Sequence, residues 1–264
     1  REDQGEIQAA LAGELPDLVA RAAIRGDLHV HTDWSDGASS LAEMAGAARE
    51  LGYEYLVISD HSQSLGVARG LNAERQRAQR AEIDALNEGW HDFRLLQGCE
   101  LEIKADGSLD LPDDVLARLD LVVASLHTSQ RQDREQITRR MLNAVTSPYV
   151  DVIGHPSGRI LGQREESAVD LDAVIEAAAA SGTALEVNAT PSRLDLDDVH
   201  VRRAIGLGVK IAVNSDAHHP DGLENLAYGV ATARRGWATA GTILNTMTLD
   251  ELLAWKEARR ARQG

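Results

Sequence analysis

Two pairs of potential metal ligands follow apolar stretches that lie far apart in the chain. His29 and His31 alternate with two apolar residues near the N-terminus. Residues two apart in a strand point to the same face, so we expect both imidazoles to point in one direction. Asp216 and His218 follow the apolar run 210–213 with the same spacing. Each pair is suited to chelating a metal ion, and the alternative is a pair of hydrogen-bonded histidines at a strand end.

Further polar side chains that could take part in chemistry follow the ends of the apolar runs. They are Asp36, His61, Glu100, Glu102, His127, His155, Glu186 and Asn188. The carboxyl ends of parallel strands form the active face of barrel enzymes, so we expect these groups to meet there with the two pairs above. Structural histidines alone rarely follow every strand so regularly, and the pattern favours a catalytic metal site.

Seven strand-like runs predict the elements that position these groups. They are residues 27–31, 55–59, 94–101, 121–126, 150–154, 184–187 and 210–214. Stretches with helical spacing lie between or after them, at 40–51, 72–90, 113–118, 133–146, 170–181, 197–207 and 249–262. This alternation predicts an α/β fold with a parallel sheet. Seven repeats predict a barrel related to the eight-stranded one.

Composition narrows the class of protein. The 264 residues suffice for one large domain or two small ones, and the formal net charge is −15. An acidic chain lacks the basic surface of a free-standing duplex-DNA binder. Cys99 is the only cysteine, which excludes an internal disulfide and suggests a reducing compartment. No apolar run reaches the length of a membrane span, so we expect no membrane partner and a cytoplasmic, nucleoid-associated location.

The first residues predict a helical lead-in. Residues 2–23 have helical spacing, with an interruption at Pro16 and with Leu11, Leu15, Leu18 and Val19 on one face. We therefore expect residues 1–25 to be a helical linker from a preceding region. It would pack on the outside of a domain formed by residues 26–264.

Six short motifs resemble those of one family. They are Asp27–His31, Ser59–His61, Gly98–Glu100, Ser125–His127, Ile153–Pro156 and Asn214–His218. The chain is similar to the polymerase-and-histidinol-phosphatase (PHP) family. Residues 60–71, 195–208 and the lead-in resemble most closely the C-terminal PHP domain of bacterial family X DNA polymerases. This resemblance implies the PHP fold, a distorted seven-stranded (β/α)7 TIM-like barrel that holds three metal ions.

The resemblance also implies which residues hold each ion. The first ion would be held by His29, His31, Glu100 and Asp216. The second would be held by Glu100, which bridges the first two ions, and by His127 and His155. The third would be held by Asp36, His61 and His218. Some relatives have histidine in place of Asp36, so the third site is richer in oxygen here.

This ligand set indicates the chemistry. Mixed imidazole and carboxylate ligands suit Mn or Zn, or Fe, rather than Mg. Such ions activate water and clamp the oxygens of a phosphate ester. We therefore expect a catalytic core of Glu100, Asp216, His29, His31, His127 and His155. Polar residues in the strand-end loops are candidate substrate contacts, namely Arg69, Arg131, Arg159, Arg164, Asn188 and Arg193.

Three functions are compatible with these residues. The first is a metal-dependent 3′→5′ exonuclease, with abasic-site or 3′-end processing as a variant, that forms the PHP part of a family X DNA polymerase in DNA repair. Its partners would be DNA 3′ ends, bound weakly by this portion alone, and the polymerase region of the same longer chain. The second is a phosphomonoesterase of the histidinol phosphatase type. The third is a metal-bound structural or regulatory module.

Overall fold

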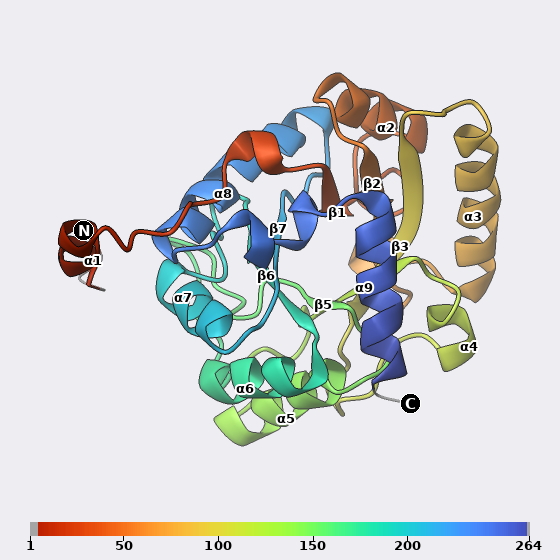
Figure 1. Ribbon diagram of the computed structural model, residues 1–264. Helices are drawn as coiled ribbons and strands as arrows, with labels where there is room; N and C mark the ends of the chain where they lie inside the picture. Colours follow the sequence, from red (N-terminus) through yellow and green to blue (C-terminus); the bar gives the residue numbers. More distant parts are fainter. Residues whose placement is uncertain (1–4, 263–264) are drawn as a thin grey trace.

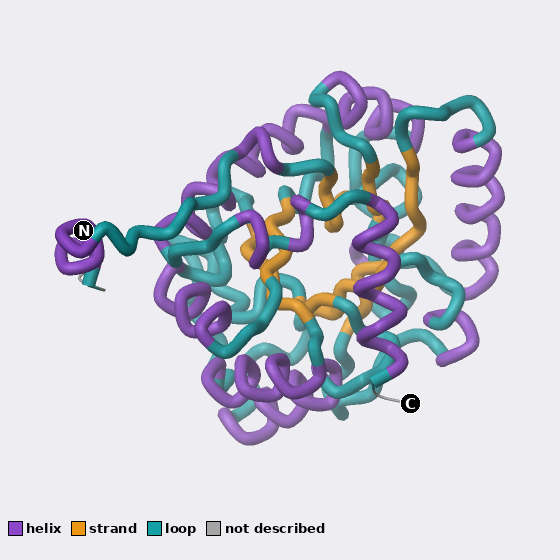
Figure 2. The backbone as a smooth tube through the Cα atoms, in the orientation of Figure 1, coloured by secondary structure: helices purple, strands orange, loops and turns teal. Residues whose placement is uncertain are grey.

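A ring of seven parallel strands forms the centre of the computed structural model, which describes residues 5–262 (Figures 1 and 2). The strands neighbour one another in chain order: β1 (Gly26–Val30), β2 (Tyr55–Ile58), β3 (Arg94–Glu102), β4 (Leu121–Ser125), β5 (Val152–Ile153), β6 (Ala184–Asn188) and β7 (Ile211–Asn214). Every neighbouring pair is parallel. The predicted α/β class and seven-stranded barrel are confirmed.

The ring is completed where β1 meets β7 and the residues that follow it. The backbone N–H of Asp216 donates to the carbonyl of His29 at 3.0 Å, and that of His31 donates to the carbonyl of Ala217 at 2.8 Å. Nearer the other end, the backbone N–H of Leu28 donates to the side-chain oxygen of Asn214. The Asn214 side chain thus replaces one backbone acceptor in the ladder between β1 and β7. The pairing of these strands brings His29 and His31 next to Asp216 and His218.

Helices surround the ring (Figure 1). They are α2 (Leu41–Glu50), α3 (Ala73–Asn87), α4 (Asp113–Leu116), α5 (Arg134–Val145), α6 (Leu171–Ser181), α7 (Asp198–Gly206), α8 (Leu226–Arg235) and α9 (Leu249–Ala261). Side-chain N-caps such as Ser40 and Asn72 set several of the starts. All agree with the prediction within a few residues except α8, which was not predicted. Among the described residues, we find no helix with the length and apolarity needed to cross a bilayer.

β5 is much shorter than the predicted run 150–154. The carboxylate of Asp151 accepts from the backbone N–H of Val122 at 2.9 Å, and it also pairs with Arg259 of α9. A side chain thus takes over a position in the ladder where a backbone carbonyl would serve in a regular strand. The regular part of β5 is therefore limited to Val152 and Ile153.

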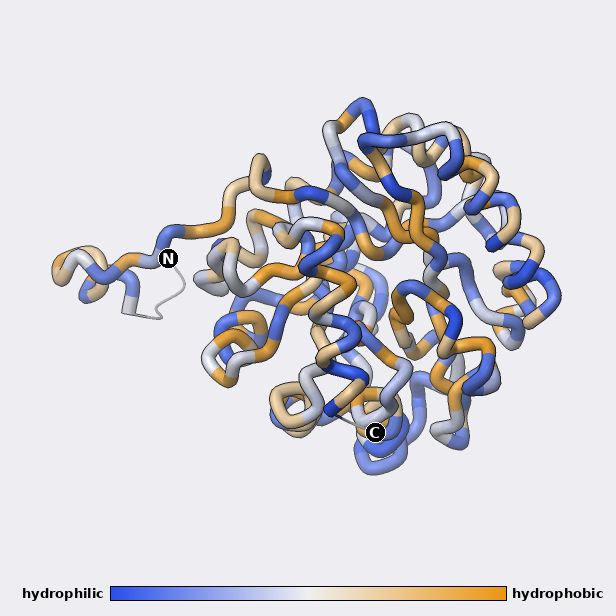
Figure 3. Tube along the Cα trace, turned by 45° about the vertical axis from the view of Figure 1, so that its right-hand side comes forward, coloured by the Kyte–Doolittle hydropathy of each residue, from blue (hydrophilic) through white to orange (hydrophobic). Residues whose placement is uncertain are grey.

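The core has two apolar layers, one on each face of the ring. The larger layer packs the outer face of the strands against the helices, with residues such as Ile58 and Val174 fully buried. The smaller layer fills the interior of the ring, where Leu28, Val57 and Val123 meet. The tube coloured by hydropathy shows apolar segments in the interior of the body and many polar segments on its outer turns (Figure 3). Both faces of the parallel sheet are covered, as such sheets require.

α9 covers the amino ends of the strands (Figure 1). Leu252 belongs to the interior layer, Lys256 donates to the carbonyl of Leu119 at 3.1 Å, and Arg259 pairs with the fully buried Asp151 at 2.6 Å. One end of the barrel is therefore filled by apolar and paired side chains. The chemically active groups lie at the opposite end.

The lead-in differs from the prediction. Its helix, α1, spans only Glu6–Ala12, and a short 3-10 turn, η1, follows at Arg21–Ala23. Gly13 adopts a left-handed conformation with φ 72° and ends the helix before Pro16 is reached. Leu11 is 84% exposed whereas Val19 is buried, so the predicted common apolar face was wrong. Figures 1 and 3 show α1 extending away from the body, and residues 1–4 lie outside the described part.

Candidate metal centre

All nine predicted ligands meet at the carboxyl ends of the strands, around a pocket of about 370 Å³. Seven of them line this pocket: Asp36, His61, Glu100, His127, His155, Asp216 and His218. The remaining two, His29 and His31, are fully buried and lie in contact with the lining carboxylates. The structure thus brings together residues that are up to 189 positions apart, from His29 to His218.

Glu100 of β3 is the centre of this cluster. Its Oε1 atom lies 2.8 Å from Nε2 of His155 and 3.2 Å from Nε2 of His127. Its Oε2 atom lies 3.3 Å from Nε2 of His29 and 3.4 Å from Nε2 of His31. The two oxygens of one carboxylate therefore face two different pairs of imidazoles, which is the geometry that a bridging ligand needs.

Asp216 completes the group around His29 and His31. Its Oδ1 atom lies 3.2 Å from Nε2 of His31 and 3.7 Å from Nε2 of His29. Ligand atoms of these three residues lie within 4.8 Å of one another, as do those of His61, Glu100 and His127. His155 also lies against Glu100, which gives two sets of donors that share this carboxylate. His61 faces the second set through Nδ1, 3.1 Å from Glu100 Oε2, and a further group through its other ring nitrogen.

A third group lies nearer the solvent. Asp36 Oδ2 is 3.4 Å from Nε2 of His61, and Asp36 Oδ1 is 3.4 Å from Nε2 of His218. His31 also faces this group through Nδ1, which is 3.8 Å from Asp36 Oδ1. The structure therefore places His31 between the first and third groups, whereas the sequence associated it with the first alone.

The turn that carries Asp36 is fixed by a buried neighbour of His61. The carboxylate of Asp60 accepts from the backbone N–H and the hydroxyl of Thr32, from the hydroxyl of Ser35 and from the side-chain amide of Gln79. All of these groups are buried. Asp60 thereby holds the turn after β1 against the end of β2, which sets the position of Asp36 relative to His61.

Two further carboxylates orient the imidazoles. Glu186 Oε1 lies 2.8 Å from Nδ1 of His29, and Glu102 Oε2 lies 2.8 Å from Nδ1 of His127. In each case the hydrogen bond at Nδ1 leaves Nε2 directed at Glu100, as in the carboxylate–histidine–metal arrangement of many metal sites. Glu102 and Glu186 stand at predicted strand ends, but nothing in the sequence indicates this role. Only their pairing with histidines distant in the sequence reveals it.

Two cluster residues have positive φ angles, which are uncommon outside glycine. His155 has φ 27° and Asp216 has φ 54°. Hydrogen bonds hold both positions, because Glu186 accepts from the backbone N–H of His155 at 2.7 Å and Asp216 donates its own N–H to β1. Strained backbone that is supported in this way is typical of functional sites.

The electrostatics keep the central carboxylates ionised. Burial alone would raise the pKa of Glu100, but His127, His29 and His61 hold it well below its ordinary value. Burial opposes protonation of His127, yet Glu100 and Glu102 outweigh it and raise its pKa to about 10. Burial and the neighbouring His61 lower the pKa of His31 to about 3. The protonated imidazoles supply positive charge where metal ions would otherwise neutralise the carboxylates.

The residues present fit divalent metal ions. Nε2 of His29 and both ring nitrogens of His31 are buried without a hydrogen-bond partner among the described residues, although carboxylate oxygens lie 3.2–3.8 Å away. Buried nitrogens without partners are costly unless something coordinates them. A set of imidazoles and carboxylates suits Zn, Mn or Fe.

Among the candidate substrate contacts, Arg193 reaches the pocket. Its side chain is 18% exposed, lines the pocket, and places Nε 3.9 Å from Asp216 Oδ2. Asn188 is fully buried and donates to Asp216 Oδ2 at 3.0 Å, so the structure places it behind Asp216. Arg193 is thus a charged donor beside the cluster, and Asn188 orients one of the cluster carboxylates.

Arg159 is committed to the backbone. Its guanidinium donates to the carbonyls of Arg193 and Leu194, and it lies within 4 Å of Glu166 and Asp197. A guanidinium with these partners holds the loop after β6 in place. Arg159 therefore supports Arg193 and does not itself line the pocket.

The other arginines are more distant from the ligands. Arg131 and Arg164 line a separate groove of about 530 Å³ together with Ser129, Gln130 and Ser167. This groove starts two residues after His127 and also contains Glu165 and Glu166. Arg69 is exposed at the end of the 3-10 turn η2 (Gly66–Ala68), which contributes Val67 and Ala68 to the pocket lining.

Comparisons with known proteins find relatives of this chain. The PHP domain family matches residues 27–190. The chain is 46% identical over 239 residues, or 90% of its length and 42% of the relative's, to the DNA polymerase/3′-5′ exonuclease PolX of Bacillus subtilis (strain 168). It is 31% identical over 83% of its length, and 89% of the relative's, to a probable phosphatase of Thermoanaerobacter sp. (strain X514).

A solved structure shares the fold. The histidinol phosphate phosphatase of Lactococcus lactis, in complex with Zn, L-histidinol and phosphate, superposes with a TM-score of 0.59 at 15% identity. The match covers 79% of this chain and 93% of that one. In contrast, the chain spans about two fifths of the length of PolX, so it corresponds to a part of that relative.

Proposed function

The chain belongs to the PHP domain family, and from this premise we propose that it is a metal-dependent phosphodiesterase that removes nucleotides from the 3′ ends of DNA. The observation that carries the proposal is the complete cluster around Glu100, in a chain that is 46% identical to a polymerase and 3′-5′ exonuclease. An intact donor set supports catalysis rather than a purely structural role. The match of the PHP family and its phosphatase relatives supports phosphoester hydrolysis in general.

Three divalent ions fit the three groups of side chains. His29, His31, Glu100 and Asp216 would hold one, Glu100, His127 and His155 a second, and Asp36, His61 and His218 a third. Bound ions of this kind lower the pKa of a coordinated water and neutralise the charge of a phosphate ester. The protein holds the donors in place through Glu102, Glu186 and Asp60, so little reorganisation is needed.

Arg193 is the proposed phosphate contact of the protein itself. It lines the pocket beside Asp216, and its backbone carbonyl is anchored by Arg159. A planar guanidinium can donate two parallel hydrogen bonds to the oxygens of a phosphodiester. With the pocket occupied, we expect Arg193 to orient the scissile phosphate toward the cluster.

We propose that the separate groove lined by Arg131 and Arg164 takes the rest of the strand. Its volume of about 530 Å³ and its two arginines suit the nucleotides that precede the terminal one, and its first lining residue, Ser129, follows His127 by two positions. Glu165 and Glu166 on the same groove weaken its attraction for phosphates. We therefore expect weak binding of DNA by this portion alone. Productive binding in a longer protein would depend on an adjoining polymerase region, as suggested by PolX.

A second candidate is a small-molecule phosphomonoesterase. It is favoured by the probable phosphatase of Thermoanaerobacter, of which the chain covers 89%. The identity is lower than that to PolX, at 31% against 46%.

The two candidates are separated by one comparison of rates. The chain, loaded with Mn²⁺, is incubated with a 5′-labelled single-stranded or gapped oligonucleotide, and in parallel with histidinol phosphate. We expect a ladder of oligonucleotides shortened from the 3′ end and little release of phosphate from histidinol phosphate. The matched control is Glu100→Gln, which should lack the ladder and so exclude a contaminating nuclease. Faster hydrolysis of histidinol phosphate would overturn the proposal, and hydrolysis of neither substrate would favour the structural module.

A further inference from the structure

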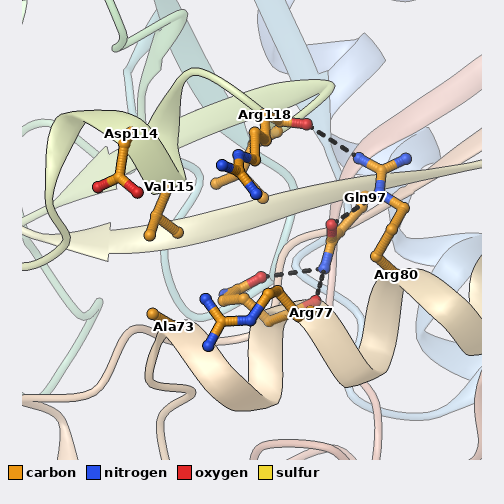
Figure 4. A pocket seen from close by; sticks show the side chains of 9 residues that line it. Ala73, Arg77, Arg80, Gln97, Asp114, Val115 and Arg118 are labelled. Atoms are coloured by element: carbon orange, nitrogen blue, oxygen red, sulfur yellow. Dashed lines mark hydrogen bonds between the residues drawn. The ribbon is translucent and has the colours of Figure 1, made fainter.

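A second pocket lies on the outer wall of the barrel, between α3 and the segment of α4 (Figure 4). It has a volume of about 150 Å³ and shares no lining residue with the metal pocket. Its wall includes Gln97 of β3, three positions before Glu100. Successive strand residues point to opposite faces, so Gln97 faces outward where Glu100 faces the cluster.

Two arginine side chains without a partner in the described part of the chain line opposite sides of this outer pocket. Arg77 and Arg118 are exposed, and within residues 5–262 their guanidinium groups make no hydrogen bond or ion pair. Arg80 is held in contrast by Asp120 at 2.8 Å and by Gln97 at 2.9 Å. Figure 4 shows Arg77 and Arg118 on opposite sides of the space, one on α3 and the other just after α4. Asp114 is the acidic residue among those lining the pocket. In a chain of net charge −15, two unpaired guanidinium groups at one pocket point to an anionic ligand.

The floor of the outer pocket is apolar. Val115 and Leu119 are 9% and 2% exposed, and Ala73 faces them from the first turn of α3. A cavity of about 150 Å³ accepts a ring of the size of benzene. Guanidinium groups both stack on planar rings and bind phosphate oxygens. We propose that this pocket binds a free mononucleotide, with its base against Val115 and Leu119 and its phosphate between Arg77 and Arg118.

Buried amide groups connect the outer pocket with the third group of metal ligands. The side-chain amide of Gln97 donates to Gln79 at 3.2 Å, and that of Gln79 donates to Asp60 at 2.6 Å. Asp60 precedes His61 and holds Thr32 and Ser35 of the turn that carries Asp36. A ligand that draws Arg80 or Gln97 toward itself would therefore act on the position of Asp36 and His61. The coupling is reciprocal, so nucleotide and metal should alter each other's affinity.

A 3′→5′ exonuclease releases mononucleotides, so the pocket would sense the product, and this part of the inference rests on the proposed function. The pocket itself does not depend on it, because its lining residues are separate from the metal ligands.

The binding test titrates deoxycytidine 5′-monophosphate, whose base is a single six-membered ring, into the Mn²⁺-loaded chain by calorimetry. We expect two binding events in the wild type, one at each pocket. The double variant Arg77→Ala/Arg118→Ala should lose the outer event, with affinity at least about tenfold lower, as should Ala73→Leu, which fills the pocket. Arg139→Ala, which removes an exposed helical arginine of α5, is the matched control and should retain both events. Arg193→Ala should instead weaken the event at the metal pocket.

The outcomes separate this inference from the proposed function. A wild-type protein that shows only the outer event, with none at the metal pocket, would contradict the proposed function and leave the outer site intact. The absence of an event that depends on Arg77, Arg118 and Ala73 would overturn the outer site. Binding of a tetranucleotide in place of the mononucleotide would also overturn it.

The coupling has its own measurement. The affinity of the third site for Mn²⁺ is compared with and without the mononucleotide, in the wild type and in Arg77→Ala/Arg118→Ala. A shift that disappears in the double variant confirms the coupling. An equal shift in both proteins assigns it to the metal pocket and contradicts the coupling.

Discussion

Oε1 of Glu100 lies 2.8 Å from Nε2 of His155, whereas the other oxygen of the same carboxylate faces His29 and His31. One side chain of β3 thus joins donors that come from the ends of β1 and β5. If Glu100 bridges two ions, its loss must disturb both of them together. The loss of a residue from the outer group should disturb only one.

The first prediction compares Glu100→Gln with His61→Ala. Glu100→Gln should remove two ions and lower the rate of 3′-end hydrolysis by about three orders of magnitude or more, because several kcal/mol of transition-state stabilisation are lost. His61→Ala should remove the third ion and leave at least part of the pair bound to Glu100. Metal content by mass spectrometry of the native protein, measured beside the rate, checks both. Retention of two tightly bound ions in Glu100→Gln would contradict the bridging role.

The second prediction concerns the carboxylates behind the histidines. Glu186→Gln and Glu102→Gln keep the side-chain shape but weaken the hydrogen bonds to His29 and His127. Loss of such a partner typically lowers metal affinity about 10–100-fold, and we expect the same here. Glu176→Gln on α6, whose side chain is exposed, should leave affinity unchanged. Competition with a fluorescent chelator measures the effect, and equal affinities in all three variants would refute it.

The third prediction concerns the release of protons from His127 and His218 when metal binds. Burial opposes the charged form of His127 and of His218, but nearby carboxylates raise their pKa values to about 10 and about 9 in the metal-free protein. Both side chains are therefore positively charged imidazolium ions at pH 8, and metal binding must release one proton from each. Metal affinity should rise with pH until these pKa values are passed. Calorimetry at pH 8 in buffers of different ionisation enthalpy should show proton release, and identical heats in all buffers would contradict it.

The fourth prediction concerns DNA. With a net charge of −15, the chain should bind duplex DNA weakly, and the affinity should fall steeply as salt rises from about 50 to 200 mM. Anisotropy titrations with a labelled duplex measure both properties. Tight binding that is insensitive to salt would show that the arginines near the pocket form a stronger interface than their acidic neighbours suggest.

Much of the fold followed from local pattern. Alternation of apolar residues with His29 and His31 located β1 and the direction of both imidazoles, because strand periodicity is a local property. The end of α1 at Gly13 was missed because Pro16 is the stronger breaker in sequence, although a left-handed glycine ends a helix equally well. α8 was missed because no side-chain N-cap marks its start, although Arg234 and Arg235 occupy its last turn.

The pairing of residues distant in sequence could not be predicted. Arg159 was expected to contact substrate, yet it donates to the carbonyls of Arg193 and Leu194, and nothing in the sequence relates these positions. The same holds for Glu186, whose partner His29 lies 157 residues away. Side chains of this type have many possible partners, and only the folded arrangement selects one.

Anomalous diffraction from crystals of the chain grown with Mn²⁺ tests the bridging role of Glu100 most directly. We expect three peaks, two on opposite sides of the Glu100 carboxylate and a third among Asp36, His61 and His218, with ligand distances of roughly 2.0–2.3 Å. Ions bound away from Glu100, or a cluster of side chains with no peak at saturating Mn²⁺, would contradict it.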